Sequence, residues 1–227
     1  MKGDNEEKSA FPYKIVDLKN RDEWLAVRSL GMGGSDASSI LGMNNYRTNV
    51  QLWEEKIGLR KPEDISGKPY VQYGVKAEPL IRELFALDYP EMAVEYHPHR
   101  ILRSTLEPFM TASLDGELTD PDGRRGILEI KTSNIIQKAQ YEKWKGQIPG
   151  AYYCQILHYF VVTGYDFAIL RAHLNSSWGN DRTTTVRHYF IERDSVKEDM
   201  EYLVENERKF WKCVESKTRP ALVLPVI

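Results

Sequence analysis

The segment RGILEIKTSN, residues 125–134, places an acid and an amine two positions apart in a run that alternates like a strand. Side chains at this spacing lie on the same face of a strand, so Glu129 and Lys131 are expected side by side. The turn-forming letters TDPDGRR precede this run and follow a second strand-like stretch, TASLDGEL. The two stretches are therefore expected to form an antiparallel hairpin.

The register of that hairpin decides which side chains meet. A hairpin centred near Asp122 places Asp115 opposite Glu129, and Ser113 opposite Lys131. A slip by one residue would turn the leucines and isoleucines of both strands away from the core, which opposes it. Two carboxylates that face each other across a ladder repel unless a cation lies between them. The pattern therefore predicts a cation beside Asp115 and Glu129.

Oxygen ligands of this kind suit Mg²⁺ or Mn²⁺, as one or two ions that keep some waters and accept phosphate oxygens. Asp115 and Glu129 would hold the ion, and the backbone carbonyl of Ile130 would complete its shell. Lys131 would orient or deprotonate the attacking water, which predicts phosphodiester hydrolysis. Such triplets also recur by chance. In that alternative, Lys131 only forms an ion pair with Glu129 or Asp115 on a solvated face.

A third acid is predicted on a helix over residues 70–88. The apolar stripe of this helix comprises Gly74, Ala77, Ile81, Leu84 and Phe85. Glu78 lies within about 40° of the centre of that stripe. A carboxylate on a buried face needs a partner, which could be Arg82, Arg100 or the metal cluster.

The elements that must position these residues follow from periodicity and caps. Helices are predicted over 21–30, 35–41 with Ser35 as N-cap, 48–58 with a capping box, 70–88 with a kink or restart at Pro79, and 150–164; a last one starts at Ser195. Strands are predicted near 93–103, 109–118, 126–132, 166–174 and 184–192. This order is typical of a mixed α/β domain. We expect one domain over residues 1–227, with residues 1–11 disordered.

Composition narrows the class of protein. With 227 residues, 41% of them hydrophobic and 28% charged, the chain can form one sizeable core. It has neither an apolar run of membrane-spanning length nor an apolar core in MKGDNEEKSA, so we expect a cytoplasmic protein without a membrane partner. Its two cysteines, Cys154 and Cys213, are far apart, which argues against a disulfide framework or a zinc site. The net charge of −2 neither indicates nor excludes DNA binding.

Several motifs follow one another in a recognisable order. Asp115 of SLDG lies fourteen residues before Glu129 of LEIK, with YGVKAEPLIRELF upstream and YYCQILHYF downstream. This set resembles the PD-(D/E)XK nuclease superfamily, and within it the phage lambda-type exonucleases, also called YqaJ-like viral recombinases. WLAVRSLGMGGSDASSILG and YFIERD resemble that family too, so the likeness covers roughly residues 20–210. Leu114 stands where many superfamily members have proline.

The resemblance implies a fold and a set of site residues. The fold would be a restriction-endonuclease-like core, with a mixed central sheet flanked by helices. Asp115, Glu129 and Lys131 match the catalytic triplet, and Glu78 matches the helical acid near a second metal position. The pocket for a 5′-phosphate would comprise Arg28, Ser35, Ser113 and Gln155. Arginine forks onto phosphate oxygens, and serine and glutamine add neutral hydrogen bonds.

Each residue of the phosphate pocket also has a purely structural interpretation. Arg28 could be a surface helix charge, Ser35 an N-cap, and Ser113 a polar strand residue. Gln155 could be an amide whose hydrogen bonds are satisfied within a tyrosine-rich helix.

The resemblance also implies an activity. The chain would be a metal-dependent exonuclease that digests double-stranded DNA ends from 5′ to 3′ in phage-type recombination. It would form a ring-shaped homotrimer around DNA and act beside a single-strand annealing protein. Two alternatives remain: a structure-specific nuclease of the same superfamily, and a catalytically silent DNA-binding or recombination-mediator module on the same fold. The four-cysteine iron–sulfur branch of related nucleases is excluded, because the chain has only two cysteines.

Overall fold

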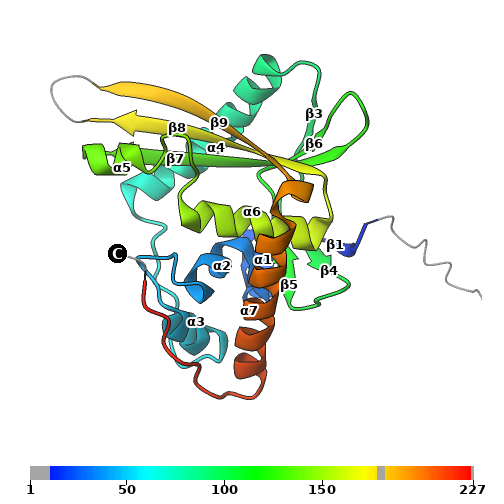
Figure 1. The fold of residues 1–227 in the computed structure, drawn as a ribbon, viewed down its shortest axis with the longest axis vertical. Coiled ribbons are helices and arrows are strands. Elements are labelled where there is room, and N and C mark those ends of the chain that lie inside the picture. Colours follow the sequence, from blue (N-terminus) through cyan, green and yellow to red (C-terminus); the bar gives the residue numbers. More distant parts are fainter. Residues whose placement is uncertain (1–10, 178–181, 226–227) are drawn as a thin grey trace, which may run out of the picture.

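Two β-sheets organise the chain, whose computed structural model describes residues 11–177 and 182–225 (Figure 1). The larger sheet has the strand order β3-β6-β7-β8-β9, comprising β3 (Ala93–Glu95), β6 (Gly116–Thr119), β7 (Arg125–Ile135), β8 (Phe167–Ser176) and β9 (Thr183–Glu192). The smaller sheet has the order β1-β4-β5-β2, comprising β1 (Tyr13–Asp17), β4 (Arg100–Ser104), β5 (Met110–Ala112) and β2 (Met32–Gly33). Each sheet combines parallel and antiparallel pairs, as predicted for a mixed α/β fold.

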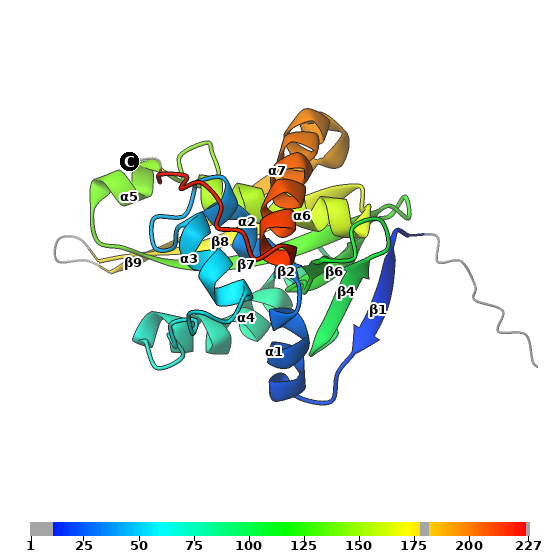
Figure 2. The same ribbon diagram turned by 90° about the horizontal axis from the view of Figure 1, so that it is seen from below.

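The described helices are α1 (Arg21–Ser29), α2 (Gly34–Ile40), α3 (Asn49–Lys56), α4 (Pro69–Asp88), α5 (Lys138–Glu142), α6 (Gly150–Thr163) and α7 (Lys197–Glu215), with a 3₁₀ turn, η1 (Arg193–Val196). Two of them cover the two faces of the larger sheet. Helix α4 lies on one face of the sheet and α6 on the other (Figure 2). Among the described residues, no helix is long and apolar enough to cross a membrane.

The alternation of β7 sorts its side chains between these two helices. Leu128 and Ile130 pack in the cluster that contains α4 residues, whereas Ile127 packs in the cluster that contains α6 residues. Side chains two apart share a face, so Glu129 and Lys131 lie on the α6 side. Helix α6 is mostly buried, as predicted from its apolar sequence.

The hairpin register agrees with the sequence prediction. Strands β6 and β7 pair from Gly116↔Leu128 to Thr119↔Arg125. Continuing this register by one residue places Asp115 opposite Glu129. Strand β6 begins at Gly116, however, so Asp115 lies just before the ladder.

Two of the predicted strands are wrong. The stretch 93–103 forms β3 and β4, and the stretch 109–118 forms β5 and β6, with the members of each pair in different sheets. The first break contains Pro98, which cannot donate to a ladder, and His99, whose φ of 59° is left-handed. At the second break, β6 begins at Gly116, so Leu114 lies outside its ladder. Leu114 packs against the core on the α6 side of the larger sheet, and not on the α4 side as the predicted strand required.

Helix ends also differ from the prediction. The N-cap of α2 is Gly33, so Ser35 lies inside the first turn. Ser195 lies in η1, where its hydroxyl donates to the carbonyl of Glu192, and α7 begins at Lys197. Local hydrogen bonding of this serine competes with an N-cap role. Thr48 caps α3 with a capping box, as predicted.

The long helix α4 runs through Pro79, so the restart predicted there does not occur. Pro79 lies on the exposed face, where the carbonyl that loses its partner can bond to water. Leu84 is also exposed, which narrows the predicted apolar stripe of this helix. At the N-terminus, residues 1–10 of the segment expected to be disordered lie outside the described residues. Phe11 packs against Tyr13 and Tyr165.

A buried ion pair joins α6 to α7. His158 and Glu207 are both fully buried, with 2.9 Å between Nδ1 and Oε1, and His158 Nε2 lies 3.0 Å from the Thr111 carbonyl. Because both ring nitrogens face acceptors, the protonated imidazole satisfies both. Burial alone would lower the pKa of His158, but Glu207 and the Thr111 carbonyl raise it above the usual 6.5.

This raised pKa predicts a loss of stability at alkaline pH. The contribution of His158 is fully present below the unfolded pKa of 6.5 and is lost as pH rises through the higher folded pKa. The free energy of unfolding, measured in urea from pH 6 to pH 10, should therefore fall more steeply for the wild type than for a double variant, His158→Gln with Glu207→Gln. Comparing the two proteins cancels the other titrating groups. A difference in stability that does not change with pH would contradict the prediction.

Candidate active site

A cavity of about 370 Å³ gathers all eight residues whose side chains were assigned to the site from the sequence. These are Arg28, Ser35, Glu78, Ser113, Asp115, Glu129, Lys131 and Gln155. They come from α1, α2, α4, α6, β7 and the segment between β5 and β6, which are far apart in the sequence. The predicted residues therefore meet in one place.

Asp115 is fixed by the backbone of the neighbouring strand. Its Oδ2 accepts a hydrogen bond of 2.8 Å from the backbone N–H of Ile130, and its carbonyl accepts one from Arg82 Nε. Burial raises the pKa of the Asp115 carboxyl, opposed by Lys131 and by the Ile130 N–H. The second oxygen of this carboxylate, Oδ1, makes no hydrogen bond in the structure described, which leaves it available to a ligand.

Glu129 is fully buried, and its carboxylate contacts the ammonium of Lys131. Neither Glu129 oxygen has any other hydrogen-bond donor in the part of the chain that the structure describes. Burial and the nearby Asp115 raise the pKa of Glu129 to about 8. A buried carboxylate with so few donors is costly unless it is protonated or meets a further cation.

Lys131 is the cation inside this cluster. Burial alone would lower the pKa of Lys131, but Glu129 and Asp115 raise it well above its usual range. Its ammonium also lies 5.1 Å from the ring centroid of Tyr152, a cation–π contact that helps to fix its position. Lys131 does pair with Glu129, as the structural interpretation predicted, but the pair lies in a cavity wall and not on a solvated face.

Glu78 approaches the cluster from α4. Its carboxylate forms an ion pair of 2.6 Å with Arg82, one helical turn away, which was one of the partners predicted for it. Burial and the proximity of Asp115 raise the pKa of Glu78 to about 7, opposed by Arg82. Glu78 thus belongs electrostatically to the acidic cluster while it is held by an arginine.

The donor set fits a hard divalent ion. Carboxylate oxygens of Asp115 and Glu129 lie in one cavity, and those of Glu129 have no donor other than Lys131. Over residues 11–177 and 182–225, no group of three His, Cys, Asp or Glu side chains is arranged to hold a metal ion. Mg²⁺ needs only one or two carboxylates, because it keeps several waters. Ligation by Asp115, Glu129, the Ile130 carbonyl and Glu78 stays a prediction.

The residues of the predicted phosphate pocket form two hydrogen-bonded groups. Arg28 Nη2 donates to Ser35 Oγ at 2.7 Å, and the Arg28 guanidinium lies 4.8 Å from the Trp24 ring centroid. Gln155 Nε2 lies 2.9 Å from the Tyr159 hydroxyl, which in turn donates to the Ser113 carbonyl at 3.0 Å. Arg28 is therefore held within the cavity wall and is not a freely solvated helix charge.

The Ser113 hydroxyl is already engaged. It donates to the Arg100 carbonyl and accepts from Trp24 Nε1, both at 3.0 Å. A phosphate oxygen can only accept, so a contact from Ser113 would require its hydrogen to leave the Arg100 carbonyl. Trp24 meanwhile ties α1 to the segment that contains Ser113.

Sequence reasoning missed some residues of this cavity. Tyr159 was not among the predicted site residues, yet it lines the cavity one helical turn after Gln155, and this spacing on one helix face was an available signal. Arg21 likewise lies two turns before Arg28 on α1. Tyr96 had no such signal, because it precedes a break that was predicted as continuous strand. Arg100 follows the same break and was predicted only as a possible partner of Glu78.

The fold and the acidic hairpin define a PD-(D/E)XK-type core, and solved structures confirm this fold class. An alkaline exonuclease from Laribacter hongkongensis superposes with a TM-score of 0.64 and 18% identity, over 87% of this chain and 94% of that one. The same exonuclease in complex with dAMP gives a TM-score of 0.61 over the same shares. A phage related exonuclease from Haemophilus somnus 129PT gives 0.54 and 17% identity, over 83% of this chain and 96% of that one.

Sequence comparison identifies the family to which the chain belongs within this fold. Residues 23–166 match the YqaJ-like viral recombinase domain, and the chain belongs to this family. The uncharacterized protein YqaJ of Bacillus subtilis (strain 168) is 31% identical over 192 residues, which are 85% of this chain and 56% of that protein. The chain thus spans about half the length of this curated relative.

Proposed function

We propose that the chain is a metal-dependent DNA exonuclease that digests double-stranded ends from 5′ to 3′ in phage-type recombination. One observation supports this most directly: Glu129 is buried with only Lys131 as a donor, next to Asp115, in the wall of an open cavity. A bound divalent cation would make this cluster of carboxylates favourable. The exonucleases of the same fold support the reaction class, and the family supports its place in recombination.

The residues of the chain divide the chemistry between them. Asp115 and Glu129 would hold Mg²⁺ or Mn²⁺, with Ile130 and Glu78 beside them, and the ion would supply an activated water and charge stabilisation when bound. The raised pKa of Lys131 keeps its side chain protonated at neutral pH, so it orients the water and offsets charge on the phosphate. Of the two roles predicted for Lys131, a raised pKa favours orientation of the water over abstraction of its proton.

The second part of the cavity would bind the terminal phosphate. Arg28 presents a guanidinium that can bond two phosphate oxygens, while Ser35 and Gln155 add neutral hydrogen bonds. The crystal structure of the Laribacter hongkongensis exonuclease with dAMP is of a protein with the same fold bound to a nucleoside monophosphate. This supports a nucleotide as the ligand of the present cavity.

The test is cleavage of a linear duplex labelled at its 3′ ends, with Mg²⁺ or with EDTA. We expect nucleotides to be released from the 5′ ends only with the metal, and faster from 5′-phosphorylated than from 5′-hydroxyl ends. Equal results with Mg²⁺ and EDTA would favour the catalytically silent module. Cleavage restricted to branched or single-stranded DNA would favour the structure-specific nuclease. A homotrimer and an annealing partner stay predictions, which the molar mass in solution and co-purification would examine.

A further inference from the structure

A second and larger cavity opens beside the catalytic one. It has a volume of about 740 Å³ and lies between the segment that joins α2 to α3 and the region from α5 to the start of α6. We call it the lateral groove. Ser35, Lys131 and Gln155 line both cavities, so the groove adjoins the proposed catalytic site at Lys131.

The lateral groove has the chemistry of a nucleic-acid surface. Among the described residues that line it there is no aspartate or glutamate, although the chain has 33 acids. Its cations are Lys131 and Lys143. Amide side chains, which hydrogen-bond to bases and phosphates alike, come from Asn44, Asn45, Gln140, Gln147 and Gln155. A polyanion can therefore enter this groove without meeting a negative charge.

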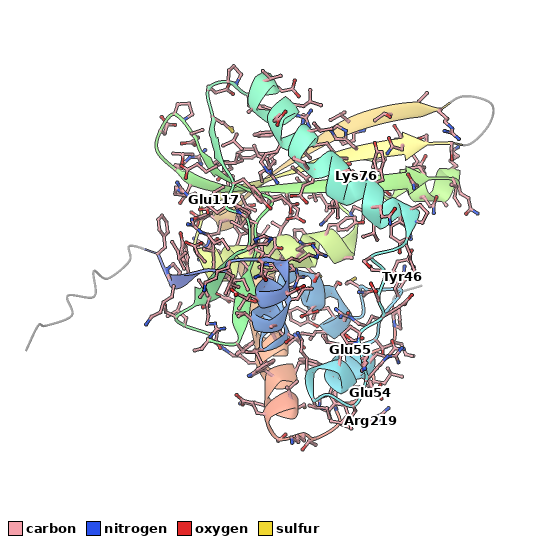
Figure 3. All side chains as sticks on the ribbon, turned by 180° about the vertical axis from the view of Figure 1, so that it is seen from behind. Tyr46, Glu54, Glu55, Lys76, Glu117 and Arg219 are labelled. Carbon is pink, nitrogen blue, oxygen red and sulfur yellow. The ribbon has the colours of Figure 1, made fainter. Side chains whose placement is uncertain are left out.

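One aromatic side chain at this groove is presented to solvent. Tyr46 is 97% exposed, and Figure 3 shows it at the edge of the molecule. The other large rings, Trp144 and Tyr152, stack on each other at 5.4 Å between centroids, and Trp144 is buried. Tyr46 is thus the ring with free faces among the groove residues described.

The loop beneath Tyr46 is rigidly held. Asn44 Oδ1 accepts from the backbone N–H of Tyr46 at 2.8 Å and from that of Arg47 at 3.1 Å. Arg47 in turn forms ion pairs with Asp36 at 2.6 Å and with Glu55 at 3.0 Å. These bonds fix the backbone of the turn at Tyr46. The ring of Tyr46 therefore projects into solvent from a backbone that is held in place.

We propose that the lateral groove binds an unpaired DNA strand, with Tyr46 stacking on one of its bases. This inference rests on the proposed function and names the form of DNA that reaches Lys131. In a duplex the base faces are covered by their neighbours, whereas an unpaired strand can offer a base to an exposed ring. The acid-free wall and the three residues shared with the smaller cavity favour a strand that runs from Tyr46 toward Lys131.

The test is the affinity of the full chain for a fluorescein-labelled single-stranded oligonucleotide, measured by anisotropy in EDTA. Removing one base–aromatic stack predicts that Tyr46→Ala weakens binding by about 5- to 150-fold. Tyr46→Phe, which keeps the ring, should bind like the wild type. Tyr202→Ala is the matched control, because Tyr202 is 61% exposed on α7 and does not line the groove.

A relaxed, covalently closed circular duplex, which has neither ends nor unpaired loops, serves as the second probe and is added as an unlabelled competitor. Its affinity should be the same for wild type and Tyr46→Ala. The proposal is overturned if Tyr46→Ala binds the single strand like the wild type, if both probes lose affinity equally, or if the wild type does not bind single strands. Cleavage of linear duplex with Mg²⁺ is measured on the same preparations. Single-strand binding that depends on Tyr46 without any cleavage would refute the proposed nuclease and leave the groove assignment intact.

Discussion

Replacing Lys131 with alanine is expected to slow cleavage of linear duplex DNA by about 10²- to 10⁴-fold, the range for loss of one positioned catalytic group. The DNA affinity should change little, because Arg28, Ser35 and Gln155 remain in the cavity. The variant should also fold. Lys131 holds the pKa of Glu129 below the value that burial alone would produce, so its removal raises that pKa further. Glu129, whose pKa is already about 8 beside Lys131, therefore stays neutral at pH 7 and is not left as an unpaired charge.

Three measurements separate the role of Lys131 from a general loss of structure. They are the initial rate of nucleotide release with Mg²⁺, the affinity for 5′-phosphorylated duplex in EDTA, and the thermal unfolding midpoint. Lys138→Ala provides a matched control, because Lys138 is exposed on α5 and lines neither cavity. A Lys131→Ala variant that cleaves at the wild-type rate would remove Lys131 from the mechanism. A variant with lost affinity but an unchanged maximal rate would make Lys131 a binding residue only.

The register of the β6–β7 hairpin could be predicted because two independent features of the sequence require it. The turn at Asp122 and the burial of Leu128 and Ile130 against α4 both require the same pairing. That pairing alone assigns Asp115 and Glu129 to one site. The side-chain period of two makes such a prediction robust to small errors in strand ends.

The breaks between the two sheets could not be predicted in the same way. Residues 96–99 and 113–115 leave one sheet and enter the other, and both segments line the cavity of the candidate active site. Alternation within residues 93–103 and 109–118 reads as continuous strand, because local pattern does not reveal which sheet a strand joins. Tyr96 was therefore missed, and Arg100 was considered only as a partner of Glu78, whereas it pairs with Asp17. The site lies where the sheets separate, which is where the sequence is least informative.

The predictions for residues on helices were only partly correct, because helical period fixes the face of a side chain but not its bonding partners. Helical period predicts which side chains share a face, and it placed Glu78 correctly toward the sheet on α4. It does not predict what a side chain bonds to after folding. The ion pair of Glu78 with Arg82 and the engaged hydroxyl of Ser113 depend on groups brought together only by the tertiary fold.

Replacing Glu129 with glutamine is expected to abolish metal-dependent cleavage and, at alkaline pH, to stabilise the fold. The folded pKa of Glu129, about 8, lies above its ordinary 4.5, so the unfolded chain releases this proton first as pH rises. Wild-type stability is therefore lost between about pH 4.5 and pH 8 and is not regained above that range. Glutamine keeps the shape of the side chain without the charge. Lys131 then retains Asp115 as its counter-charge.

The initial rate of cleavage with Mg²⁺ tests the loss of activity, and the thermal midpoint at pH 9, with EDTA or with Mg²⁺, tests the gain in stability and the loss of metal binding. In EDTA the Glu129→Gln variant should melt above the wild type, by about 2–4 °C for each kcal/mol of relieved charge burial at this chain length. Mg²⁺ should raise the wild-type midpoint, because it binds only the folded state, and should leave that of the variant unchanged. Lower stability of the variant in EDTA would show that the Glu129–Lys131 pair is structural. An equal Mg²⁺ response in both proteins would mean that the ion does not require Glu129, and Asp115 would have to hold it with other ligands.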